Sequence, residues 1–223
     1  MREKIIGVNM RLYSYWRSTA AYRVRIALNI KQLDCEIKPV HLVKDGGEQL
    51  MGPYKSINPQ SLVPSLMNDN GDVLTQSLAI IDYLEDTYPE FSLYPKNLIK
   101  KAQAKAMALS IACDVHPLNN LRVLKYLKVQ GWQQEQVDEW YAHWIHQGFA
   151  AIEQQLEKSS GLYCFGDEVS IADIFLVAQV YNANRFNVCL DDYPQICIIN
   201  LHCLKQQAFI DAMPENQADC DIS

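Results

Sequence analysis

A strand-to-helix junction near the N-terminus, within Leu12–Leu28, constrains this chain more than any other feature. Up to Ser18 the pattern suits a short strand rich in aromatic side chains, and beyond it apolar residues recur at helical spacing. Ser18 or Thr19 falls at the junction, where a hydroxyl residue caps a helix N-terminus. The sequence therefore predicts a strand that ends at a helix whose free N–H groups and positive dipole end favour an anion.

Two interpretations of Ser18 follow from the residues alone. In the simpler one, its side chain only caps the helix. In the other, the hydroxyl and the helix end stabilise a thiolate, which means lowering a thiol pKa of about 8.5 by two units, or about 2.7 kcal/mol. A helix end contributes about 0.3–1 kcal/mol and a charge-assisted hydrogen bond about 1.5–3 kcal/mol, so the two together suffice. Because the stretch holds no cysteine, the thiol would come from a ligand.

Composition limits the class of protein. The chain has 223 residues, enough for one large domain or two small ones, and its 49% hydrophobic content allows a buried core. A formal net charge of −6 argues against a nucleic-acid-binding surface. No apolar run approaches the length of a transmembrane helix, and no signal-peptide pattern follows Met1. We therefore expect a cytoplasmic protein that binds neither nucleic acid nor membrane.

The cysteines and histidines indicate neither a disulfide framework nor a metal site. Seven cysteines are scattered without a C-x-x-C pair, which fits reduced thiols in a cytoplasm. The five histidines form no H-E-x-x-H motif and no cluster with cysteine, so no metal is expected.

The first part of the chain alternates strands and helices. Strands are predicted over residues 4–14 and 34–42, with a helix over 18–31, which implies a parallel strand pair with a right-handed crossover. Pro64 marks the start of another strand, because proline cannot donate to a ladder. A hairpin turn and a further strand follow, and the pair Gln76-Ser77 begins the next helix.

The second part of the chain is predicted to be helical only. Two prolines in Tyr88–Pro95 mark an interdomain linker. Helices are predicted over residues 97–128, 133–157, 174–183 and 193–209. Pro117 should kink or end the first of them near His116. Ser170 and Asp173 form a capping-box variant that fixes a buried helix, and the polar tail from Pro214 to Ser223 is expected to be loose.

The residues from Tyr13 to Leu28 resemble the opening signature of zeta-class glutathione transferases, the family that includes maleylacetoacetate isomerase. The likeness continues through Val63-Pro64, Gln76-Ser77 and the capping box, so it covers both parts of the chain. It implies a thioredoxin-like α/β domain over residues 1–88, a linker over 89–95 and an all-helical domain over 96–223. Glutathione transferases hold the Val63–Pro64 bond cis, bind ligands in the cleft between the two domains and form homodimers.

The resemblance also implies a site. Ser18, assisted by Thr19, is expected to hold the thiolate of glutathione, which acts as a cofactor. The remaining glutathione contacts are expected from Gln49, Val63, Gln76, Ser77, His116, Asn120 and Arg122. A small dicarboxylate substrate is expected to meet Arg17, Arg122 or Arg185, because guanidinium pairs with carboxylate bidentately.

The implied reaction is the glutathione-dependent cis–trans isomerisation of maleylacetoacetate to fumarylacetoacetate. One departure is Ala20, which stands where animal members usually have cysteine. Three alternatives stay open: a maleylpyruvate isomerase, which the run from His116 to Asn120 resembles more closely, a general zeta-class transferase or dehalogenase, and a non-catalytic binding protein.

Overall fold

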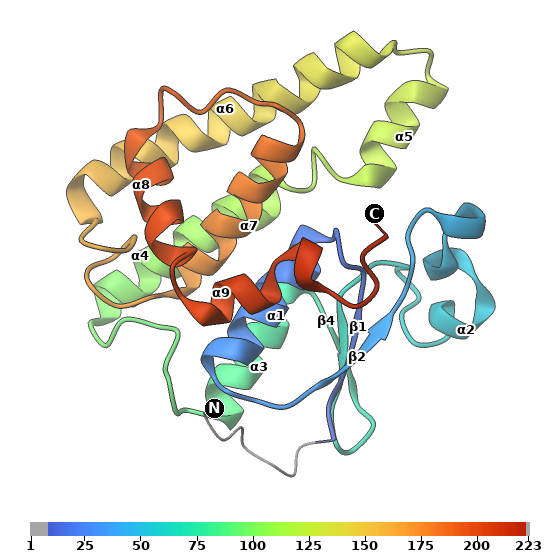
Figure 1. The fold of residues 1–223 in the computed structure, drawn as a ribbon, viewed down its shortest axis with the longest axis horizontal. Coiled ribbons are helices and arrows are strands. Elements are labelled where there is room, and N and C mark those ends of the chain that lie inside the picture. The colour runs from blue at the N-terminus through green and yellow to red at the C-terminus, as the bar shows by residue number, and fades with distance from the viewer. Residues whose placement is uncertain (1–8, 222–223) are drawn as a thin grey trace. The chain divides into compact units, whose positions relative to one another are not determined.

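The computed structural model describes residues 9–221. These residues fall into two compact units, one made of residues 9–92 and 206–221 and the other of Leu93–Lys205. The last part of the chain therefore packs with the N-terminal unit. Figure 1 shows the reason within that unit: helix α9 (Gln207–Ala212) lies beside helix α1 (Thr19–Ile30).

The first unit is built on a four-stranded mixed sheet in the order β2-β1-β3-β4. The strands are β1 (Arg11–Ser14), β2 (Glu36–Pro39), β3 (Ser65–Met67) and β4 (Val73–Thr75). β1 and β2 are parallel, whereas β3 is antiparallel to both β1 and β4. The predicted parallel pair is thus confirmed, although residues 4–8 of the predicted first strand lie outside the described residues.

Helix α1 forms much of the core of this unit. Its side chains from Ala21 to Leu28 are all buried, and it packs against both α9 and α3 (Ser77–Thr87). The cation of Lys31, just past its end, is buried and bonds to Glu85 at 2.7 Å and to the Tyr88 carbonyl at 2.7 Å. Between β2 and β3 the chain forms only short turns, namely 3₁₀ turns at Lys44–Gly46 and Glu48–Leu50 and helix α2 (Gly52–Lys55).

The second unit is helical, and with the mixed sheet of the first it confirms the predicted fold class. Its helices are α4 (Leu98–Leu109), α5 (Leu121–Val129), α6 (Gln134–Ser159), α7 (Ile171–Arg185) and α8 (Pro194–Cys203). Helix α7 is the centre of the unit: it packs against α4 and α8, and its side chains from Ile171 to Val180 are all buried.

The helix predicted over residues 97–128 is interrupted. After α4 the chain forms a π-helical turn, Ser110–Val115, and then a loop that leads to α5. The break falls where Pro117 predicted it. Gly148 of α6 allows a close approach here, because a Cβ at that position would lie 2.2 Å from Cγ2 of Val115.

Two expectations about the C-terminus were wrong. The helix predicted over 193–209 is divided into α8 and α9, with a turn between them. The tail is held rather than loose as far as it is described. Asn216 Nδ2 donates to the Ile210 carbonyl at 2.7 Å, and Gln217 Nε2 donates to the carbonyls of Asp211 and Met213 at 2.9 and 2.8 Å. Side-chain amides therefore satisfy carbonyls at the end of α9 and fold the tail back.

Candidate active site

Strands β1, β3 and β4 each have a terminus at the same end of the sheet. Tyr13 of β1 pairs with Ser65 of β3, and Ser65 pairs with Thr75 of β4. Because β3 is antiparallel to its neighbours, the chain enters the sheet at Ser65 and leaves it just after Tyr13 and Thr75. The segments that precede β3 and follow β1 and β4 therefore lie at the same end.

These segments carry the residues that the sequence singled out. Ser18 follows β1, Val63 precedes β3, and Gln76 with Ser77 follows β4. The Val63–Pro64 bond is cis, as the resemblance predicts. The fold thus brings together two helix N-termini and the cis peptide bond in one unit.

Ser18 caps helix α1, which both interpretations require, so its role in holding a thiolate stays a prediction. Its Oγ accepts from the Ala21 amide at 3.2 Å, and its own amide donates to the Tyr15 carbonyl at 2.9 Å. The side chain is half-buried, whereas that of Thr19 is buried. As an acceptor of one bond, the hydroxyl keeps its proton for a further acceptor. No acidic residue occupies the first turn of α1, so this end of the helix attracts an anion.

The N-terminus of α3 is open as well. Gln76 adopts φ 68° and ψ 118° and makes no side-chain cap, and no acidic residue follows in the first turn. Its Nε2 instead donates to Gln60 Oε1 at 3.3 Å. The buried cation of Arg23 reaches the Ser77 hydroxyl at 3.4 Å. A helix N-terminus without an acidic residue in its first turn, beside a buried cation, suits a carboxylate.

A hydrogen-bond network that the sequence did not predict holds the loop before β3. The Leu62 carbonyl accepts from Tyr54 Oη at 2.6 Å and from Asn58 Nδ2 at 2.8 Å. Both side chains also bond to Ser65 Oγ, at 2.9 and 3.2 Å. Burial raises the pKa of Tyr54, so its hydroxyl keeps the proton that it donates. The network fixes the backbone on either side of Val63.

Gln49 offers a polar atom in the same unit. Its side chain is buried, and its Nε2 donates to the Leu42 carbonyl at 3.4 Å, while Oε1 has no partner among the described residues. The preceding Gly47 has φ 110°, and a Cβ there would lie 2.6 Å from Gln49 Nε2. Glycine at position 47 thus allows the close turn that holds Gln49.

In the second unit, α6 anchors the loop between the π-helical turn and α5. Asn119 Nδ2 donates to the Tyr141 carbonyl at 3.0 Å, and Trp140 Nε1 donates to the Leu118 carbonyl at 2.9 Å. Asn120 caps α5 by accepting from the Arg122 amide at 3.1 Å, and the Arg122 side chain is exposed. Hydrogen bonds at Leu118 and Asn119 therefore hold this loop on α6.

Arg185 lies near the same stretch of α6. It ends α7, and its guanidinium lies 4.9 Å from the ring of Phe186, which stacks on Tyr141 at 3.8 Å. Burial raises the pKa of Tyr141, and its hydroxyl has no partner within residues 9–221. Arg185 and Asn119 therefore converge on Tyr141, whereas Arg122 extends from the exposed face of α5. The proximity of these residues to glutathione stays a prediction.

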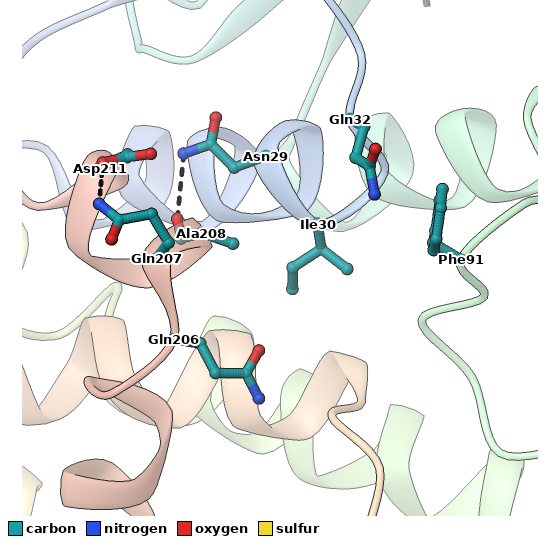
Figure 2. A pocket seen from close by; sticks show the side chains of 8 residues that line it. All are labelled: Asn29, Ile30, Gln32, Phe91, Gln206, Gln207, Ala208 and Asp211. Atoms are coloured by element: carbon teal, nitrogen blue, oxygen red, sulfur yellow. Dashed lines mark hydrogen bonds between the residues drawn. The ribbon is translucent and has the colours of Figure 1, made fainter. Parts of the chain in front are cut away.

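A cavity of about 780 Å³ lies at the other end of α1 (Figure 2). It is lined by Asn29, Ile30 and Gln32 from the end of α1, by Phe91 and by residues of α9. Asn29 donates to the Ala208 carbonyl at 3.0 Å. Because Asn29 lies about 16 Å along the helix from Ser18, this cavity is distinct from the predicted site.

Comparison with known proteins identifies the family. Residues 12–92 match the glutathione S-transferase N-terminal domain, and residues 130–196 match the C-terminal domain. A probable maleylacetoacetate isomerase from Vibrio cholerae is 49% identical over 93% of this chain and 97% of its own length. The chain therefore belongs to the glutathione S-transferase family.

Two solved structures refine the class. A bacterial maleylpyruvate isomerase, described as a zeta-class glutathione S-transferase, has a TM-score of 0.90 at 41% identity and covers 94% of this chain and 99% of its own. A maleylacetoacetate isomerase from Methylobacterium extorquens AM1, crystallised with malonate and glutathione, has a TM-score of 0.91 at 36% identity over 95% of this chain and all of its own. The fold and sequence place this chain in the zeta class. Across residues 9–221, no helix is long and apolar enough to cross a membrane.

Proposed function

We propose that the chain is a glutathione-dependent cis–trans isomerase that converts maleylacetoacetate to fumarylacetoacetate. The observation that carries the proposal is the pair of open helix N-termini, at Ser18 and Ser77, at one end of the sheet. Each lacks an acid in its first turn, so each can hold one anionic group. Glutathione carries such groups at its thiolate and at its γ-glutamyl carboxylate, and the relatives support the same reaction.

In this proposal the first unit holds glutathione. The Ser18 hydroxyl donates to the thiolate, aided by the end of α1 and by Thr19. Gln76 and Ser77 receive the γ-glutamyl carboxylate at the end of α3. The backbone of Val63 faces the peptide, and Gln49 Oε1 accepts from one of its N–H groups. By the family resemblance, His116, Asn120 and Arg122 are further candidates for contact with glutathione.

The bound cofactor supplies a thiolate that adds reversibly to the double bond of the substrate and so allows rotation about it. The chain's own residues lower the barrier by stabilising charge. Ser18 keeps the thiol deprotonated. Arg17, Arg122 and Arg185 are candidates to pair with the substrate carboxylates and with the enolate that forms as the double bond opens. Since position 20 is alanine, no protein thiol at that position takes part.

Maleylpyruvate is the second candidate substrate. The run from His116 to Asn120 favours it, and so does the maleylpyruvate isomerase structure with a TM-score of 0.90. We further propose that the protein works as a homodimer in the cytoplasm, where its seven cysteines, none of which forms a disulfide within residues 9–221, would stay reduced.

The test is to mix the purified protein with glutathione and either maleylacetone, a stable analogue of maleylacetoacetate, or maleylpyruvate. We expect the cis isomer to disappear while the concentration of free glutathione stays constant. The ratio of the rates with maleylacetone and with maleylpyruvate identifies the preferred substrate. Ser18→Ala should slow both reactions. Stoichiometric loss of glutathione would instead indicate a conjugating transferase, and the absence of both reactions would refute the proposal.

A further inference from the structure

The turn between β1 and α1, which contains Ser18, is held by residues far from it in the sequence. This turn, Tyr15–Ser18, is closed by the bond from the Ser18 amide to the Tyr15 carbonyl. The Trp16 amide donates to Asp219 Oδ2 at 3.0 Å, across 203 positions of sequence. A residue of the C-terminal tail thus bonds to the turn two positions before Ser18.

A buried arginine bonds to the same turn and to the base of the tail. Arg25 is 3% exposed, and its Nη1 and Nη2 donate to the carbonyls of Tyr15 and Trp16 at 3.4 and 3.0 Å. Its Nε donates to the carbonyl of Ala212, the last residue of α9, at 3.1 Å. One rigid guanidinium therefore fixes the distance between the turn and the point where the tail begins.

Further contacts hold the C-terminal tail close to this turn. The amides of Asn216 and Gln217 fold it back onto the end of α9, as described above. Cys220 packs against a cluster of buried side chains that includes Trp16 and Val63. His41 Nε2 lies 3.2 Å from Asp221 Oδ2. Side-chain amides therefore fold the tail onto the end of α9, and the contacts of Cys220 and Asp221 hold it near Trp16, Val63 and His41.

We propose that the tail segment Ala212–Cys220 is part of the glutathione site and that Asp219 is a positioning residue for Ser18. Asp219 touches neither thiolate nor substrate; it holds the Trp16 amide and so fixes where the Ser18 hydroxyl points. This inference rests on the proposed function, because it assumes that Ser18 holds a thiolate. A misplacement of about 1 Å in such a group can cost about a hundredfold in rate, so the loss of one bond is expected to cost about tenfold.

Two substitutions at one position separate this role from a simple effect of charge. Asp219→Ala removes the acceptor, whereas Asp219→Asn removes the charge but keeps an oxygen that can accept from the Trp16 amide. If Asp219 acted only as a negative charge near the thiolate, both variants would lower the pKa of the bound thiol. If it positions Ser18, Asp219→Ala raises that pKa and Asp219→Asn leaves it close to the wild-type value.

The matched control is Asp211→Ala, which removes an exposed carboxylate of α9 that accepts a hydrogen bond from Gln207 Nε2 in the same helix. Three properties are measured on the intact chain: hydrogen exchange of the Tyr15–Ser18 segment, the pKa of bound glutathione from thiolate absorbance, and kcat with KM. For Asp219→Ala we expect faster exchange, a thiol pKa higher by about one unit and kcat lower by about tenfold. Asp219→Asn and Asp211→Ala should each stay within about twofold of wild type.

The outcomes distinguish this inference from the proposed function. A wild-type chain that binds glutathione only as a neutral thiol would refute the proposed function and this inference with it. A wild-type thiolate that is unchanged in Asp219→Ala would overturn the inference alone, even if exchange becomes faster. A lowered thiol pKa in both Asp219 variants would overturn it as well.

Discussion

Two serines cap helices in this protein, and they do so in opposite ways. Ser170 begins α7 in a closed capping box: Asp173 Oδ2 accepts from the amide and hydroxyl of Ser170, each at 2.8 Å, and Oδ1 accepts from the Cys164 amide at 2.9 Å. All of these groups are buried. Ser18 begins α1 with a single bond from the Ala21 amide, no acid in the first turn and a half-buried side chain.

A helix N-terminus binds an external anion only when no side chain of its own first turn supplies one. A carboxylate in the first turn of α7 fills that end and stabilises the fold. Its absence from the first turn of α1 leaves the same dipole and N–H groups available to an external anion. Mutations at the N-terminus of α7 should therefore change the free energy of unfolding. Mutations at the N-terminus of α1 should mainly change the rate of the reaction.

The largest effect is expected at the closed end. Asp173→Ala leaves the amides of Cys164 and Ser170 buried without their partner, at about 1–3 kcal/mol each, so the free energy of unfolding should fall by about 3–5 kcal/mol. Urea denaturation measures this change. The exposed Asp191→Ala is the control and should change it by less than about 0.5 kcal/mol. A loss below about 1 kcal/mol for Asp173→Ala would contradict the closed-box account.

The next effect is expected at the open end. Ser18→Ala removes a charge-assisted hydrogen bond of about 1.5–3 kcal/mol, so kcat for isomerisation should fall by about 10- to 150-fold. Stability should fall by only about 0.5–2 kcal/mol, the usual cost of losing such a cap. Ser18→Thr keeps a hydroxyl and should retain most of the activity. Full activity in Ser18→Ala would mean that Ser18 is a cap and nothing more.

A smaller effect should follow from partly closing the open end. Ala20 is half-buried in the first turn of α1, and Ala20→Asp places a carboxylate there. The carboxylate should stabilise the helix by about 0.3–1 kcal/mol and repel the thiolate, which lowers kcat/KM by about two- to fivefold. Ala20→Asn is the uncharged control. Thermal unfolding measures the change in stability and steady-state kinetics measure the change in kcat/KM, on the same samples. A gain in both stability and activity would contradict the proposed difference between the two helix ends.

The smallest effect is a dependence of stability on pH. Burial raises the pKa of Asp173 in the folded protein, even though its hydrogen bonds oppose the shift. The folded state then binds more protons than the unfolded state above the unfolded pKa of about 3.9. The contribution of Asp173 is therefore largest below that pH and declines as the pH rises through the folded value. The difference in unfolding free energy between wild type and Asp173→Asn should shrink over that window, and a difference that grows would reverse the assigned sign.

Both caps could be predicted from the sequence because each is a local pattern. Ser18 stands between a strand pattern and a helical period, and Ser170 stands three residues before its acid. The prediction of a cis bond at Pro64 depended on the family resemblance, since nothing in the residues themselves distinguishes cis from trans.

What the sequence did not predict depends on contacts between distant residues. Tyr54 and Asn58 lie in a stretch without periodicity, and only the folded chain brings their side chains to the Leu62 carbonyl and Ser65. The tail was expected to be loose because it is polar, yet Asp219 finds its partner 203 residues away. Polar composition indicates exposure on average, but it cannot reveal a partner that only the tertiary fold supplies.

The most direct test of the account is the pKa of the glutathione thiol on the protein, followed by thiolate absorbance from acid to alkaline pH. We expect the wild-type protein to lower this pKa by about two units from its free value, and Ser18→Ala to lose at least one unit of that shift. A bound thiol that titrates as it does in free solution, or a shift that survives Ser18→Ala intact, would contradict the claim that the open end of α1 holds a thiolate.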